Sequence, residues 1–172
     1  MSPWKPLAHV AFALLLAALQ AALLTWLGGG AFSVSLLAVC VVWAGMHGGI
    51  VDGSVASAGI GYLMDLAAGT PKGLMTFLAV ALFVAVRAVS AAVDLRGRAG
   101  FALLSGLGAL FLSIGATILL RNTSASEAVP GWGLAGRMLL EALLTGAAAP
   151  VVAMGLRRLD ALFHREEPGL LR

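Results

Sequence analysis

The feature that most constrains this chain is a series of six apolar runs separated by very short polar breaks. A membrane-spanning helix needs about 20 mostly apolar residues, and most of the runs approach that length. They cover roughly 7–27, 32–47, 49–68, 71–93, 99–120 and 132–156. The short breaks require consecutive helices to be antiparallel neighbours. The predicted fold class is therefore all-α, an integral membrane protein built as a six-helix transmembrane bundle.

Composition agrees with this prediction. The chain is 60% hydrophobic and 11% charged, whereas soluble domains carry about 25% charged residues. Its 172 residues suit one transmembrane domain, 1–172, without a separate soluble domain. The first apolar run is longer than the core of a usual signal peptide, so we expect it to be retained as the first helix. Cys40 is the only cysteine, which excludes an intramolecular disulfide.

The basic residues predict the orientation. The net charge is +3, but the cations sit at the ends of apolar runs and form no patch with interleaved aromatics. We therefore read them as topology signals and expect no nucleic-acid partner. Six spans would place both termini on one side, together with seven cations: Lys5, Arg96, Arg98, Arg157, Arg158, Arg165 and Arg172. The other side would hold Lys72, Arg121 and Arg137. This asymmetry predicts that both termini are cytoplasmic. Four tryptophans at predicted helix ends suggest contact with the headgroup level: Trp4, Trp26, Trp43 and Trp132.

A stripe of small residues runs along the third predicted helix and ends at an acid. Steps of four residues from Gly49 give Gly53, Ser57, Gly61, Asp65, Gly69 and Gly73. Residues four apart share a helix face, and small residues there let helices approach closely. We expect Gly69 to end this helix, Thr70 to act as the N-cap of the next helix and Pro71 to lie in its first turn. The stretch thus predicts a tight helical hairpin at the outer surface.

Asp65 is the acid inside this hairpin. A charged aspartate at mid-membrane costs roughly 2.5–3.5 kcal/mol, and less near the interface. One hypothesis is that Asp65 accepts hydrogen bonds from the free amides at the start of the fourth helix, or pairs with Lys72, and so staples the hairpin. A second is that it also faces a partner protein. A third is a proton or ion relay, which lacks a second carboxylate at the same depth.

Four further charges and one proline mark candidate sites. Asp52 and Arg87 lie near the inner ends of the third and fourth helices, where Arg87 is predicted to be the structural counter-charge of Asp52, with substrate binding as the alternative. Arg137 and Glu141 are four residues apart on the sixth helix and can neutralise each other, with a ligand role for Glu141 as the alternative. Pro150 is expected to kink that helix.

No catalytic or metal-binding pattern appears in the sequence. Three histidines are scattered along the predicted inner side, His9, His47 and His164. One histidine and one aspartate, such as His47 and Asp52, do not complete a metal site, which needs three or four ligands. We therefore predict a protein that is not an enzyme and has no metal and no cofactor.

Residues 59–86, "GIGYLMDLAAGTPKGLMTFLAVALFVAV", resemble the signature of the MreD family of rod shape-determining membrane proteins. That signature has a glycine-containing segment, Leu-x-Asp-Leu, a small turn and a second glycine opening the next apolar helix. The matching positions are Gly61, Leu63 or Leu66, Asp65, Gly69 and Gly73. Residues 145–163 are similar to the family's last helix, which contains a proline and ends in basic residues. One departure is His47 with a glycine pair, where an arginine is often found.

The resemblance implies a non-enzymatic scaffold subunit of the bacterial cell-wall elongation machinery, the elongasome. Such a protein would maintain rod cell shape and support peptidoglycan synthesis from the cytoplasmic membrane. Its implied direct partner is MreC. Its implied indirect partners are the actin-like MreB, the polymerase RodA and RodA's penicillin-binding transpeptidase, all at the lipid bilayer.

The resemblance also implies a fold similar to the substrate-binding subunits of energy-coupling-factor vitamin transporters, and such a subunit is the alternative function. In those subunits an Ala-xxx-Ala stripe on the first helix contacts the transmembrane partner, and Ala13, Ala17 and Ala21 have that spacing here. A vitamin binder should gather polar and aromatic groups in an outer pocket. This chain has one tyrosine, Tyr62, and few outer polar residues, which favours the scaffold.

Overall fold

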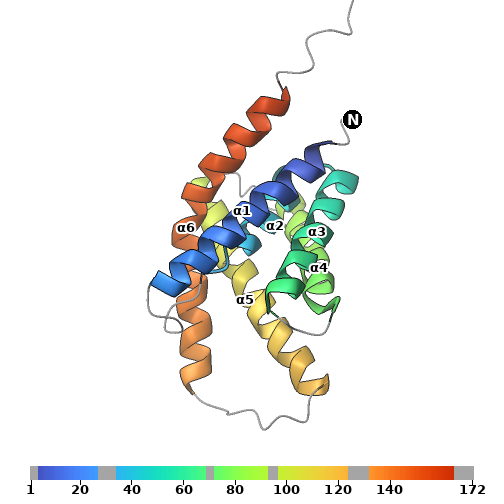
Figure 1. Ribbon diagram of the computed structural model, residues 1–172. Coiled ribbons are helices and arrows are strands. Elements are labelled where there is room, and N and C mark those ends of the chain that lie inside the picture. Colours follow the sequence, from blue (N-terminus) through green and yellow to red (C-terminus); the bar gives the residue numbers. More distant parts are fainter. Residues whose placement is uncertain (1–3, 27–33, 69–71, 93–96, 124–131, 165–172) are drawn as a thin grey trace, which may run out of the picture.

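A computed structural model describes residues 4–26, 34–68, 72–92, 97–123 and 132–164. These residues form six α-helices and no strand. In chain order the helices are α1 (Trp4–Trp26), α2 (Leu36–His47), α3 (Ile50–Ala68), α4 (Leu74–Ala92), α5 (Arg98–Thr123) and α6 (Trp132–His164). Each helix contacts the next one in sequence, as the short breaks predict, and all six pack into one bundle (Figure 1).

The short helix α2 is the centre of the bundle. It contacts each of the other five helices, and its residues from Leu36 to Gly45 are all buried. An evenly apolar helix of this kind is typical of a buried core element. Its 12 residues extend only about 18 Å, against a hydrocarbon core of about 30 Å. Helix α2 thus begins at Leu36 and not at the predicted 32, and a helix enclosed by other helices need not match the bilayer thickness. That the segment 32–47 crosses the membrane stays a prediction.

Side chains from other helices complete both ends of α2. At its start, the Ser35 N–H donates to Thr145 Oγ1 over 3.0 Å, and the Leu36 N–H donates to Gln20 Oε1 over 3.1 Å. At its end, Arg87 Nη1 donates to the carbonyl of Gly48 over 2.7 Å. Backbone groups at helix ends need such partners where water is absent. Tertiary contacts therefore replace a side-chain cap at the start of α2, and at its end they add to the local bond from the Gly48 N–H to the Ala44 carbonyl.

Within the described residues, three helices are long and apolar enough to cross a membrane. They comprise Leu74–Ala92 in α4, Arg98–Leu120 in α5 and Gly133–Ala161 in α6. Their large apolar side chains also point outward, as with Phe77, Leu143 and Val151, each about two-thirds or more exposed. Large exposed apolar surfaces suit contact with lipid. These helices make the chain a membrane protein.

The α5–α6 pair crosses at two glycines. A Cβ added at Gly106 would lie 2.9 Å from the carbonyl oxygen of Ala142, and one added at Gly146 would lie 3.0 Å from that of Ala102. Each helix thus places a small-xxx-small pair, Ala102 with Gly106 and Ala142 with Gly146, against the other's backbone. The sequence analysis did not predict this crossing, although two small residues four apart in each helix indicate such close packing.

Two predicted boundaries need correction. Helix α4 begins at Leu74 and not at Pro71; Thr70 and Pro71 themselves lie outside the described residues. Helix α6 continues to His164, well beyond the predicted end at 156, because its last turns contact α1 and α2 through Asp160. Pro150 lies inside α6, which runs as one helix across it and changes direction along its length (Figure 1).

Candidate functional site

Asp65, near the end of α3, receives hydrogen bonds from the start of α4. Its carboxylate accepts from the backbone N–H groups of Gly73, Met75 and Thr76 over 3.0, 2.8 and 3.1 Å. It also accepts from the Thr76 hydroxyl over 2.7 Å. The amides of Met75 and Thr76 belong to the first turn of α4, and that of Gly73 immediately precedes it; a helix start lacks internal partners and favours an anion. The predicted contact between Asp65 and this helix start is confirmed, and only 4% of Asp65 is exposed.

The Asp65 carboxylate caps the start of α4. Because α4 starts at Leu74, its N-terminal amides are capped by a side chain eight to eleven residues upstream. Gly73 makes this geometry accessible, since its φ of +95° is a conformation that side-chain-bearing residues rarely adopt. Lys72, the predicted counter-charge, is exposed.

The glycine stripe on α3 packs against protein. A Cβ added at Gly53 would lie 2.5 Å from Cε2 of Phe83, and one added at Gly61 would lie 2.6 Å from Cα of Thr76. Ser57, between them, is fully buried. The stripe as predicted is too long, however, because an added Cβ at Gly49 would meet only Asp52 at 3.7 Å and one at Gly73 would meet nothing within 4 Å. Gly69 lies outside the described residues.

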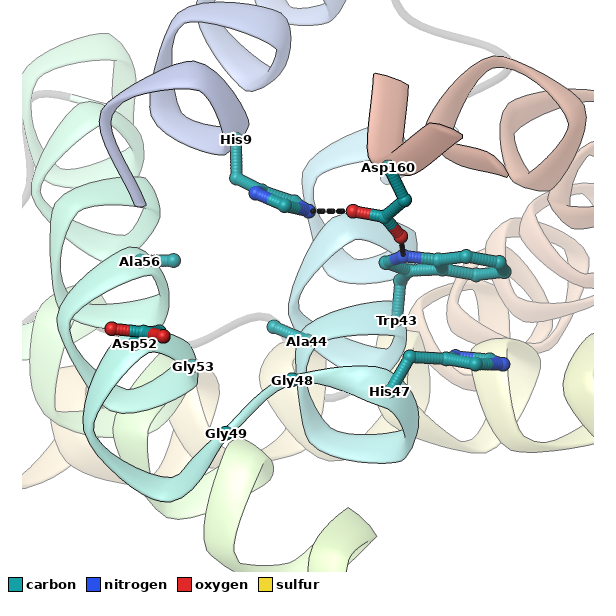
Figure 2. A pocket seen from close by; sticks show the side chains of 10 residues that line it. All are labelled: His9, Trp43, Ala44, His47, Gly48, Gly49, Asp52, Gly53, Ala56 and Asp160. Carbon is teal, nitrogen blue, oxygen red and sulfur yellow. Dashed lines mark hydrogen bonds and ion pairs between the residues drawn. The ribbon is translucent and has the colours of Figure 1, made fainter. Parts of the chain in front are cut away.

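A pocket of about 380 Å³ opens at the end of the bundle where α1 begins and α6 ends. Figure 2 shows that its polar side chains come from four helices: His9 from α1, Trp43 and His47 from α2, Asp52 from α3 and Asp160 from α6. The remaining wall is made of small residues, Ala44, Gly48, Gly49, Gly53 and Ala56. A volume of this size falls in the range of small-molecule sites.

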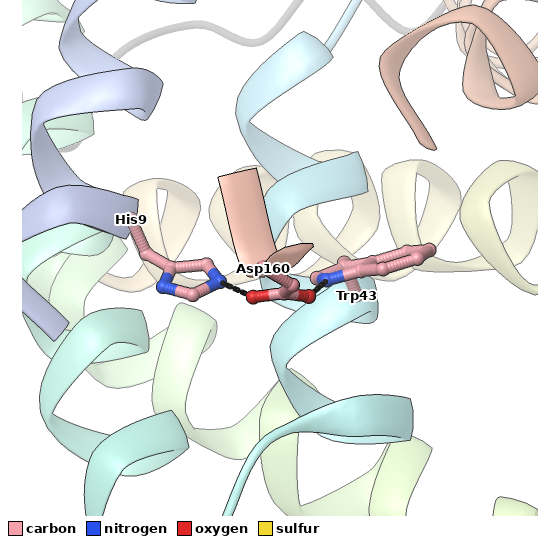
Figure 3. A network of polar contacts seen from close by, with 3 residues as sticks. All are labelled: His9, Trp43 and Asp160. Atoms are coloured by element: carbon pink, nitrogen blue, oxygen red, sulfur yellow. Dashed lines mark hydrogen bonds and ion pairs between the residues drawn. The ribbon is translucent and has the colours of Figure 1, made fainter. Parts of the chain in front are cut away.

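Asp160 links three helices at this pocket. His9 Nε2 lies 3.1 Å from Asp160 Oδ1, and Trp43 Nε1 donates to Asp160 Oδ2 over 3.0 Å (Figure 3). The imidazole of His47 stacks on Trp43 with ring centroids 3.9 Å apart. The carboxylate thus holds the start of α1 and the end of α6 onto the central helix.

These contacts correct three predictions. His9 and His47 are not scattered, because both line the same pocket. Trp43 does not lie on the lipid-facing surface, because it is 3% exposed and bonded to Asp160. Arg87 does not form an ion pair with Asp52 among the described residues, and its guanidinium donates to the Gly48 carbonyl instead. Asp160 itself was not singled out by sequence reasoning; its only signal is an acid among the basic residues that follow the sixth apolar run.

The residues that line this pocket suit binding better than catalysis. Among the described residues no group of three or more histidine, cysteine, aspartate or glutamate side chains could hold a metal ion. Asp52 is half-buried on the pocket wall, and the pocket presents hydrogen-bonding groups beside small apolar ones. It can hold a small polar or cationic group, and it contains no nucleophile paired with a base.

The N-terminal half of α6 carries the remaining candidate charges, Arg137 and Glu141. Glu141 is half-buried and accepts a hydrogen bond from the Ser113 hydroxyl of α5 over 3.1 Å. Arg137 is exposed. The neutralisation of Glu141 by Arg137 stays a prediction. The Ser113 contact forms a polar link between α5 and α6.

Comparisons with known protein families, with curated proteins and with solved structures find no match to this chain.

Proposed function

We propose that this chain is a membrane scaffold subunit of the bacterial cell-wall elongation machinery, of the MreD type, without enzymatic activity. The observation that carries the proposal is the Asp65 network. Three residues of the signature segment have separate structural tasks: Gly61 allows close packing, Asp65 caps α4, and Gly73 supplies the left-handed turn. A segment built this way presents one rigid hairpin at the membrane surface, as a scaffold requires.

The proposed setting is the cytoplasmic membrane, with MreC as direct partner and MreB, RodA and its transpeptidase reached through it. The proposed architecture is a bundle of membrane helices around the short central helix α2, of the kind seen in substrate-binding subunits of energy-coupling-factor transporters. Both termini are proposed to be cytoplasmic. The contact between His9 and Asp160 supports this, because it places the start of α1 and the end of α6 at the same end of the bundle.

One observation favours the alternative, a vitamin-binding transporter subunit: the pocket lined by His9, Trp43 and Asp160 has a suitable volume. Its place argues against that function, since it opens at the end proposed to be cytoplasmic, whereas such a subunit collects its substrate from outside. The scaffold therefore remains the proposed function.

Affinity purification of the full chain in mild detergent tests the proposal, with co-purifying proteins identified by mass spectrometry. Recovery of MreC is expected. Recovery of ATPase subunits, with MreC absent, would replace the scaffold with the transporter subunit.

The orientation gives a separate prediction. Reporter fusions placed after Arg172 and within 122–128 are expected to read cytoplasmic and external, respectively, because the basic residues concentrate at the end that carries both termini. Alkaline phosphatase and green fluorescent protein activities provide the two readouts. The opposite pattern would overturn the proposed topology.

A further inference from the structure

A second, smaller cavity lies between α5 and α6, apart from the His9–Asp160 pocket. It has a volume of about 150 Å³. Arg98 and Phe101 of α5 line one side, and Pro150, Ala153, Met154 and Arg157 of α6 line the other. The walls thus combine two guanidinium groups with an apolar floor.

The charge of this cavity is positive. Arg98 is the first residue of α5, so the cavity adjoins a helix N-terminus, which also favours an anion. Among the described residues, no acidic side chain lines it. Arg98 has no ion pair or hydrogen bond with any described residue, and the Arg157 guanidinium lies 5.9 Å from the Trp43 ring centroid. The nearby Asp160 is engaged by His9 and Trp43. Both arginines are exposed, and within the described part of the chain no carboxylate of the cavity wall pairs with them.

The cavity lies near the start of the apolar segment of α5 and near the end of that of α6. Arg98 begins the membrane-spanning part of α5, and Arg157 lies near the end of that of α6. Beyond the cavity, exposed apolar side chains continue along both helices, among them Leu103, Leu107 and Val151. A molecule with an anionic head and an apolar tail would place its head in the basic cavity and its tail along the apolar side chains. Basic pockets between membrane helices bind anionic headgroups in this way.

We propose that this cavity binds an anionic phospholipid. Arg98 and Arg157 hold the phosphate, since guanidinium groups pair with phosphate oxygens through two hydrogen bonds each. Phe101, Ala153 and Met154 receive the first part of the acyl chains. The lipid would sit across the α5–α6 seam. This inference does not depend on the proposed scaffold function.

The test is a lipid titration of the full chain in detergent, followed by native mass spectrometry. Phosphatidylglycerol is expected to bind, and phosphatidylcholine to bind more weakly. Replacing both arginines, Arg98→Gln with Arg157→Gln, should weaken phosphatidylglycerol binding about 25-fold, because each lost charge is expected to weaken it about fivefold. The control Arg137→Gln with Arg158→Gln removes the same net charge from residues outside the cavity and should leave the affinity unchanged.

Two further arms complete the design. Met154→Trp fills the cavity without removing a charge and should also weaken lipid binding, while circular dichroism melting reports whether each variant folds. Glycerol 3-phosphate tests the headgroup alone and should bind far more weakly than the lipid. Equal loss in the two double variants would overturn the site, and equal binding of glycerol phosphate and lipid would overturn the assignment to a lipid.

Discussion

Replacing Asp65 with leucine is expected to lower the free energy of unfolding by about 3–5 kcal/mol. The change would remove the acceptor for three backbone amides and one hydroxyl at the start of α4, and leucine offers them nothing in return. The measurement is reversible unfolding in mixed detergent micelles. Asp52→Leu is the matched control: it makes the same substitution in the same helix, at a half-buried acid that the Asp65 network does not include.

Asp65→Asn separates the hydrogen bonds from the charge. Both carboxylate oxygens accept hydrogen bonds, Oδ1 from Met75 and Oδ2 from Gly73 and Thr76. An amide NH₂ must face at least one of these donors. We therefore expect an intermediate loss of about 1–3 kcal/mol.

The same two variants bear on function through cell shape. If Asp65 acts by stabilising the hairpin, rod shape should follow protein level, with leucine losing both and asparagine retaining part of each. Should asparagine abolish rod shape while level and melting stay normal, the charge itself would contact a partner. That result would contradict the structural role of Asp65.

Gly61→Leu is expected to destabilise the bundle by about 1–3 kcal/mol through overpacking. Its first side-chain atom alone would lie 2.6 Å from Cα of Thr76 and 2.9 Å from the carbonyl oxygen of Met75. These are backbone atoms, so no side-chain rotation relieves the contact, and α3 and α4 must move apart. The expected measurement is a lower melting temperature in detergent.

Gly136 provides the control for this substitution, because a Cβ added there would meet nothing within 4 Å. Gly136→Ala should leave stability unchanged or raise it by about 0.5–1 kcal/mol, since alanine favours a helix over glycine. Gly61→Ala should act in the opposite direction. Equal responses at the two positions would mean that the α3–α4 contact does not limit stability.

The sequence alone determined the helical class, the membrane setting and the α3–α4 hairpin. Apolar runs of this length form helices in lipid, because each backbone N–H and C=O must find its hydrogen-bond partner within its own segment. The stripe through Gly53, Ser57 and Gly61, with Asp65 close to a glycine turn, likewise fixed a local geometry. Its partners are only eight to eleven residues away, and local spacing is enough to bring them together.

Only the tertiary structure decided which helix is central and which polar groups meet. Apolarity could not distinguish α2 from a lipid-facing span, because lipid and helix neighbours are equally apolar, and only its length and burial set it apart. His9, Trp43 and Asp160 are brought together from positions as much as 151 residues apart, and Thr145 reaches Ser35 across 110 residues. Such pairs cannot be recognised from a periodic pattern in the sequence. A helix end or a buried indole needs only one correctly placed partner, and the packing of the whole bundle decides which residue that is.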